Sequence, residues 1–101
     1  MDKRDLLISA QRALLEKVTP NLRSVCLTAS NECIELSFYY DHTPSEEEKE
    51  LASLADAEFI ADFPSPEYKT RFCQKIVSFP ERMPDVGFCI YHRYEPYPNS
   101  E

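Results

Sequence analysis

The sequence predicts an α+β fold, a four-stranded antiparallel sheet with two helices packed on one face. Two stretches, near residues 3–18 and 43–63, repeat apolar residues at helical spacing. Four shorter stretches alternate apolar and polar residues or are rich in aromatic and β-branched residues, as strands are. The order is α-β-β-α-β-β, and two hairpins with two amphipathic helices bury their apolar sides best as two packed layers.

The length of the chain is that of one domain. With 101 residues it supports a single hydrophobic core, so residues 1–101 are predicted to form one domain. The proline-rich end, residues 95–101, is predicted to be a flexible tail.

The first helix is predicted to begin at Asp2 or Lys3 and to end before Pro20. Asp2 can cap it, and Asp5 in the first turn suits the helix dipole. The residue before a proline leaves the α region, and Asn21 favours a turn. The predicted apolar stripe is Leu6, Leu7, Ala10, Ala13, Leu14 and Val18.

The next two runs, residues 22–29 and 33–40, predict a β-hairpin because both alternate and a short turn joins them. In the second run one side is wholly apolar or aromatic, and this side is expected to face the core. It consists of Ile34, Leu36, Phe38 and Tyr40. Tyr39 points the other way and is predicted to be an exposed strand residue.

The longest regular stretch runs from Thr43 to Pro64. Thr43 is predicted to cap this helix, with Pro44 at the first helical position and Glu46 completing a capping box. Pro64 ends the helix, because its ring clashes with a continuing helical backbone. The predicted apolar side is Leu51, Leu54, Ala55, Phe59, Ile60 and Phe63, and the opposite side is acidic.

The last two strands are predicted at residues 68–79 and 86–94, and we expect them to pair as a second hairpin. The first is rich in aromatic and β-branched residues, and the second alternates along its length. A loop bounded by Pro80 and Pro84 joins them.

Charge is distributed unevenly along the chain. Between Asp41 and Glu67 there are nine acids and one base, Lys49, whereas the remaining residues hold nine acids and ten bases. The net charge of −7 opposes binding to nucleic acid and favours a basic protein partner. No apolar run approaches the roughly 18 residues of a membrane span, and the N-terminus lacks the apolar core of a secretory signal. We therefore expect a cytoplasmic protein that binds no membrane.

The four cysteines and two histidines form no recognisable metal or catalytic motif. No C-x-x-C or H-x-x-x-H spacing is present, so neither a metal nor another cofactor is predicted. Cys26 and Cys33 are expected near each other across the first hairpin, and Cys73 and Cys89 across the second, as free thiols. Cys89 and His92 should point to opposite faces of a strand, which argues against a Cys–His nucleophile and against enzymatic activity.

Two interpretations of the acidic helix face stay open. The acids can form a solvated surface that keeps the protein in solution. They can also form a recognition surface for a positively charged partner, with a nearby tyrosine as an anchor. The candidate partner-binding residues are Tyr39, Asp41, Glu46, Glu47, Glu50, Asp56 and Glu58.

Three segments carry a family resemblance: DLLISAQRALLEKVTPNLRSVCL at 5–27, ELSFYYD at 35–41 and SEEEKELASLADAEFIADFP at 45–64. Together they resemble a family of small bacterial proteins with an α-β-β-α-β-β plan, which are immunity proteins of toxin systems, including contact-dependent growth inhibition. The resemblance implies a binding protein rather than an enzyme, and the first hypothesis is that it binds a cognate toxin domain, a nuclease being one candidate, and blocks it by occlusion. The uneven charge of the chain predicts that this toxin domain has a basic surface. These segments are scaffold motifs, so the resemblance assigns no functional residue.

Two other classes of function remain alternatives. A small adaptor or weak homodimer could use the outward face of the sheet, around Cys33, Tyr39, Cys89 and Tyr91. An unrecognised enzyme or metal protein would need a Cys/His cluster that the spacing does not predict. For an immunity-type protein we expect a monomer or a weak homodimer.

Overall fold

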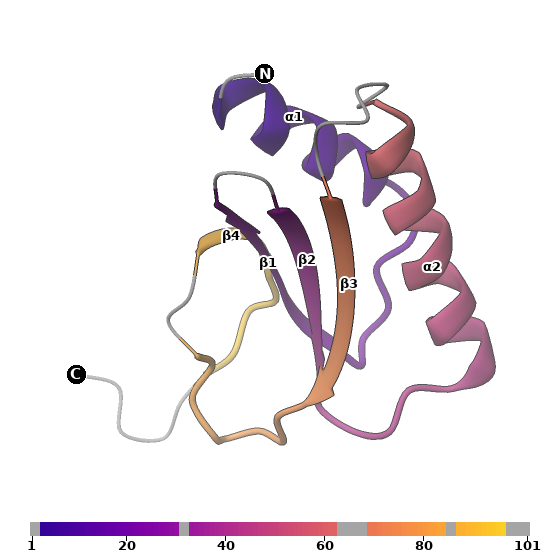
Figure 1. Cartoon of the computed structure of the whole chain (residues 1–101). Helices are drawn as coiled ribbons and strands as arrows, with labels where there is room; N and C mark the ends of the chain where they lie inside the picture. The colour runs from indigo at the N-terminus through magenta and orange to yellow at the C-terminus, as the bar shows by residue number, and fades with distance from the viewer. Residues whose placement is uncertain (1–2, 31–32, 63–68, 85–86, 97–101) are drawn as a thin grey trace.

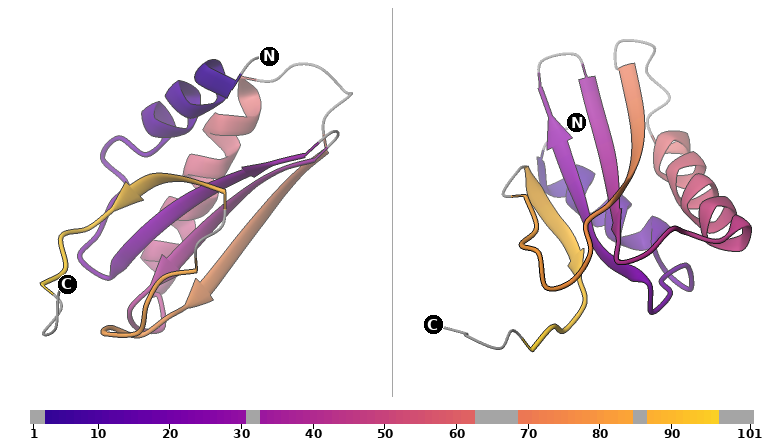
Figure 2. Two further views of the ribbon diagram at one scale, coloured as in Figure 1. Left: turned by 90° about the vertical axis from the view of Figure 1, so that its left-hand side faces the viewer. Right: turned by 90° about the horizontal axis from the view of Figure 1, so that it is seen from below.

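The computed structural model describes residues 3–30, 33–62, 69–84 and 87–96. The elements follow in the predicted order: α1 (Lys3–Ala13), β1 (Leu22–Ala29), β2 (Cys33–Tyr40), α2 (Glu46–Ala61), β3 (Lys69–Ile76) and β4 (Phe88–His92). Both helices lie on one face of a four-stranded sheet (Figures 1 and 2). The predicted order and the two-layer arrangement are thus confirmed. Among the described residues, no helix combines the length and the apolar character needed to cross a membrane.

The sheet differs from the prediction in how its last two strands pair. The spatial order is β3-β2-β1-β4, so β3 and β4 lie at opposite edges and the predicted second hairpin is wrong. β1 pairs antiparallel with β2 and with β4, whereas β2 pairs parallel with β3. The physical reason is that α2 lies between β2 and β3 as a crossover connection, which is the kind of link that parallel neighbours need.

The β1–β2 hairpin has the predicted bounds, and its predicted core side is confirmed. Ile34, Leu36 and Phe38 are buried in the core that the helices cover. On the opposite side of the hairpin Ser37 and Tyr39 are also buried, with Tyr39 only 2% exposed, so the prediction of an exposed Tyr39 is wrong. Residues 77–84 pass over this side of the sheet on their way from β3 towards β4, which sequence periodicity does not reveal (Figure 2).

Helix α1 is shorter than predicted. It ends at Ala13, and a turn with Glu16 at φ 65° follows, so the chain leaves the helical path before Val18. Four members of the predicted stripe are buried: Leu6, Ala10, Ala13 and Leu14. Val18 is exposed, which corrects its assignment to the core. The predicted cap, Asp2, lies outside the described residues.

Helix α2 begins two residues later than predicted. Ser45 is the cap: its side chain accepts from the Glu48 backbone N–H at 3.1 Å, and the Glu48 carboxylate accepts from the Ser45 N–H at 2.9 Å. This is a capping box, so the prediction had the right motif at the wrong residues. The buried side is Ala52, Ala55 and Phe59, whereas Leu54, predicted as core, is 48% exposed. The helix ends at Ala61, and the predicted terminator at residue 64 lies outside the described residues.

Candidate partner-binding surface

Three of the predicted binding residues lie together on the exposed side of α2. Glu46, Glu47 and Glu50 occupy the first half of the helix and are all exposed, away from the buried Phe59. Their negative charge suits the N-terminal end of the helix dipole, so the fold tolerates this concentration of acids. Glu46 is 3.4 Å from Lys49, which is itself exposed. We call Glu46, Glu47 and Glu50 the acidic α2 surface.

The other two acids predicted on α2 have different surroundings. Glu58 is exposed but bound to Lys17, which lies 2.8 Å away in the segment that follows α1. Asp56 is half-buried, and its Oδ1 atom has no hydrogen-bond partner in the described structure. Burial raises the pKa of Asp56. Because Glu58 is paired with Lys17 and Asp56 is half-buried, neither residue extends the acidic α2 surface.

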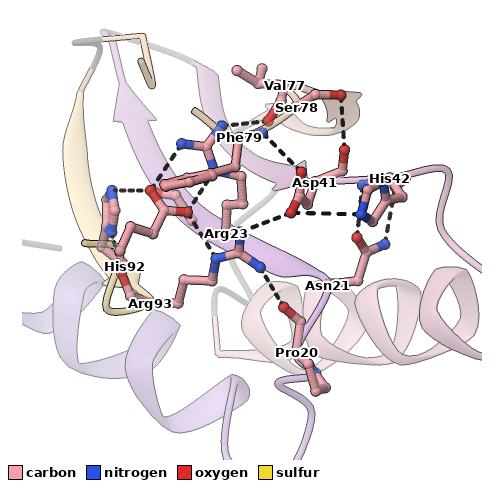
Figure 3. A network of polar contacts seen from close by, with 12 residues as sticks. Pro20, Asn21, Arg23, Asp41, His42, Val77, Ser78, Phe79, His92 and Arg93 are labelled. Atoms are coloured by element: carbon pink, nitrogen blue, oxygen red, sulfur yellow. Dashed lines mark hydrogen bonds and ion pairs between the residues drawn. The ribbon is translucent and has the colours of Figure 1, made fainter. Parts of the chain in front are cut away.

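Asp41, also predicted to bind a partner, belongs to a polar network inside the protein (Figure 3). Its carboxylate accepts from the Phe79 backbone N–H at 2.8 Å and from Arg93 at 2.9 Å, while Ser78 donates to its carbonyl at 3.0 Å. The Phe79 N–H, followed by Arg93, lowers the pKa of Asp41. Asp41 therefore ties the loop after β3 and the segment after β4 to the end of β2.

Replacing Asp41 with asparagine is expected to destabilise the protein at neutral pH. The loss should be about 1.5–3 kcal/mol, the usual contribution of hydrogen bonds to a charged group. Because the pKa of Asp41 is lowered on folding, its stabilisation is complete above the unfolded pKa of about 3.9 and disappears as the pH falls through the folded value. Urea denaturation at pH 7 and at pH 3 should show the variant converging on the wild type in acid. A constant difference at both pH values would contradict this assignment.

Arg23 is the centre of this network, and sequence reasoning did not single it out. Its side chain is fully buried, with Nε and a terminal nitrogen 2.6 and 2.9 Å from the two carboxylate oxygens of Glu95. It also donates to the Val77 carbonyl and lies over the Phe79 ring, 5.6 Å from its centroid. Arg93 contacts the same carboxylate at 2.8 Å. Glu95, predicted to begin a flexible tail, is thus held by two arginines, and residues 97–101 lie outside the described residues.

The TPNLR segment supplies several of the contacts around this network. Thr19 donates to Glu48 at 2.6 Å, and Asn21 donates to both Glu48 and the His42 carbonyl. The Pro20 carbonyl accepts from Arg93. These residues, which directly precede β1, connect the N-terminus of α2 with the end of the sheet. The TPNLR motif was therefore the sequence feature that could have pointed to this network, although the spacing of its residues does not identify their hydrogen-bond partners.

Beside the acidic α2 surface the structure is hollowed. A depression of about 420 Å³ lies next to the N-terminus of α2. It is lined by Pro20, Asn21, Asp41, His42, Thr43, Ser45, Glu48 and Arg93. The two carboxylates that line it, those of Asp41 and Glu48, already accept hydrogen bonds within the protein. The depression therefore presents a shape to another molecule rather than unpaired charges.

The structure buries one of the residues on the outward sheet face that an adaptor or homodimer was predicted to use, whereas Cys89 is exposed and Cys33 is half-buried. Tyr39 is buried, which also raises its pKa, so it is not accessible as an anchor in this structure. Cys26 pairs in register with Cys89 on β4, and its β2 neighbour is Ser37 rather than Cys33, so the predicted neighbourhood of Cys26 and Cys33 is wrong. None of the four cysteines forms a disulfide, and no cluster of metal-binding side chains occurs among the described residues.

Comparison of the sequence with known protein families gave a match to a family model. A family model described as MafI2 immunity protein matches residues 3–95, which includes both helices and all four strands. No significant match was found among curated proteins.

Proposed function

The chain belongs to the MafI2 immunity protein family, and from this premise we propose that it binds a cognate toxin, a MafB protein, and neutralises it by covering the toxin's active surface. As a member of an immunity protein family it is a binding protein and not an enzyme. We place its action in the cytoplasm, where a toxin that has entered the cell would meet its target.

The observation that carries the proposed interface is the charge of α2 and its caps. Residues 45–62 contain seven acids and one base, a net charge of −6, whereas the whole chain has a net charge of −7. The acids of the acidic α2 surface are exposed and project from a rigid helix rather than from a loop. Such a surface accelerates the encounter with a basic protein and disfavours an acidic one.

We further propose that the toxin is a nuclease. An enzyme that binds nucleic acid must neutralise phosphates with lysine and arginine, so its active surface is basic. Carboxylates spaced along one side of a helix can occupy such a surface in place of phosphates. Covering this surface excludes the substrate without any chemical step by the immunity protein. Delivery of the toxin by contact-dependent growth inhibition stays a prediction of the sequence resemblance.

Reversing two charges of the acidic α2 surface tests the interface. The double variant Glu47→Lys/Glu50→Lys is expected to raise the Kd for the cognate toxin about 10–100-fold at low salt, because attractive contacts become repulsive. The dependence of log Kd on log salt concentration should also become weaker. Biolayer interferometry over a range of salt concentrations would measure both quantities, and the melting temperature would verify folding.

The matched control is Glu16→Lys/Glu81→Lys, which changes the net charge by the same amount at exposed acids outside α2. This variant should alter Kd by only a few-fold through long-range electrostatics. Equal losses in both variants would mean that net charge alone matters. In that case the acids of α2 would be a solvated surface and the toxin would bind elsewhere.

A further inference from the structure

The outer edge of β3 is a second surface with the properties of a binding site. Among the strands that the structure describes, β3 lies at one end of the sheet order with β2 as its one neighbour, and its eight residues pair with β2 without a register irregularity. β4, at the other edge, has five residues and pairs with β1 through a register shift. Long, regular edge strands can pair with an added strand, whereas short or irregular ones resist it.

The hydrogen bonding shows which backbone groups of β3 point outward. The Val77 N–H donates to the Tyr40 carbonyl at 2.8 Å, so at residue 77 the backbone N–H points towards β2. Because these groups alternate along a strand, those of Lys75 and Cys73 also point inward. The N–H and C=O groups of the intervening residues point to the outer side. These residues are Thr70, Phe72, Gln74 and Ile76.

The side chains of β3 specify the chemistry of the segment that would pair with it. One side of the strand carries three exposed cations, Lys69, Arg71 and Lys75, with no acid in the strand. The other side carries two partly exposed apolar residues, Phe72 at 38% and Ile76 at 51%. An added strand places its own side chains beside these two rows. The complementary segment therefore alternates acidic with aliphatic or aromatic residues.

A second copy of this chain is a poor occupant of this edge. Two β3 strands related by a two-fold axis perpendicular to the sheet would pair antiparallel, with their cationic sides on the same face. Six cations would then lie close together, and like charges on neighbouring strands are destabilising. The charge of β3 thus protects against self-association and selects a partner that brings carboxylates.

We propose that β3 binds an extended acidic and apolar segment of the toxin by strand addition, which continues the sheet across the interface. The inference rests on the proposed function for the identity of the partner. It adds a contact in which backbone hydrogen bonds supply affinity and the two rows of side chains supply selectivity. A toxin held this way meets the immunity protein at an edge of the sheet as well as at the acidic α2 surface.

Amide hydrogen exchange of the full chain, free and bound to its cognate toxin, tests the strand addition directly. In the free protein the outward amides of Thr70, Phe72, Gln74 and Ile76 should exchange quickly, and the inward amides of Cys73 and Lys75 slowly. Toxin binding should slow the outward amides on the order of tenfold or more, because each gains a hydrogen-bonded partner. If the exchange rates of the outward amides were unchanged in a complex in which the toxin is neutralised, the inference would be overturned and the proposed function would stay intact.

Charge reversal supplies an independent readout with a matched control. Arg71→Glu/Lys75→Glu is expected to raise the Kd for the toxin about tenfold or more, because carboxylates would then face carboxylates. Arg4→Glu/Arg12→Glu makes the same charge change at exposed positions of α1. On a basic toxin this control should leave Kd unchanged or lower it, so the two variants are expected to move Kd differently.

Other outcomes have distinct meanings. Equal effects of the two double variants would overturn the assignment of β3. Protected outward amides in the free chain at high concentration, together with sedimentation as a dimer, would identify a second copy as the occupant and also overturn it. A toxin that does not bind the chain at all would remove the proposed function and this inference together.

Discussion

Replacing Arg23 with methionine is expected to lower the free energy of unfolding by about 3–5 kcal/mol, the usual cost of removing one partner of a buried ion pair. Methionine keeps much of the side-chain length, so the change removes mainly the charge and the hydrogen bonds. Glu95, whose side chain is 1% exposed, would still contact Arg93, and the Val77 carbonyl would lose a donor. Urea denaturation monitored by circular dichroism would measure the loss.

Two further variants show whether the buried charge is responsible. Arg4→Met removes an exposed arginine and should change stability by no more than about 0.5 kcal/mol. Adding Glu95→Gln to Arg23→Met removes the buried carboxylate that has lost its Arg23 partner, so the double variant should be less destabilised than the sum of the single variants. Strict additivity, or a loss below about 1 kcal/mol for Arg23→Met, would show that the ion pair does not stabilise the fold.

Phe59→Ala is expected to cost a similar amount for a different reason. Phe59 is 1% exposed and packs into the core between α2 and the sheet, so truncation removes buried apolar area and leaves a cavity. Such substitutions typically cost about 3–5 kcal/mol. The same denaturation experiment would detect the loss as a lower midpoint with an unchanged slope.

Leu54→Ala is the informative control on the same helix. Periodicity alone assigns Leu54 to the core, but the structure leaves it 48% exposed. Its truncation should therefore cost much less than that of Phe59, about 1 kcal/mol or less. Comparable losses at residues 54 and 59 would mean that α2 is rotated about its axis relative to this structure.

The orientation and start of α2 illustrate what the sequence could predict and what it could not. The helix itself followed from apolar spacing and a capping motif, which are local properties. Two overlapping motifs were available, Thr43 with Glu46 and Ser45 with Glu48, and they differ little in local chemistry. In the structure Glu48 also accepts from Thr19 at 2.6 Å, a contact between distant parts of the chain. Long-range contacts of this kind accompany the choice of cap and are not visible in the local pattern.

The pairing of β3 also depended on distant contacts. A strand has the same alternation of side chains whether its neighbour is parallel or antiparallel, so the composition of residues 69–76 could not decide the question. The strand–helix–strand order of β2, α2 and β3 was the usable signal, because a helical crossover suits parallel neighbours.

The candidate site was predictable where it depended on helix periodicity and unpredictable where it depended on tertiary contacts. Glu46, Glu47 and Glu50 are exposed together, as the charge pattern of one helix indicated. Tyr39 is buried and Asp41 is hydrogen-bonded, because loops from later in the chain return to the sheet. Arg23 and Glu95 are 72 residues apart, a distance at which no local pattern links two side chains.

The separation of Arg23 and Glu95 along the chain also limits how early during synthesis the fold can be completed. Arg23, at the start of β1, is hydrogen-bonded to Glu95, which lies 72 residues later in the chain. The contacts of Arg23 therefore cannot be completed until residue 95 has been synthesised. At a translation rate of about 5–20 residues per second, roughly 4–14 s pass between the synthesis of these two residues. Any activity that needs the completed sheet therefore follows the synthesis of β1 by at least this interval.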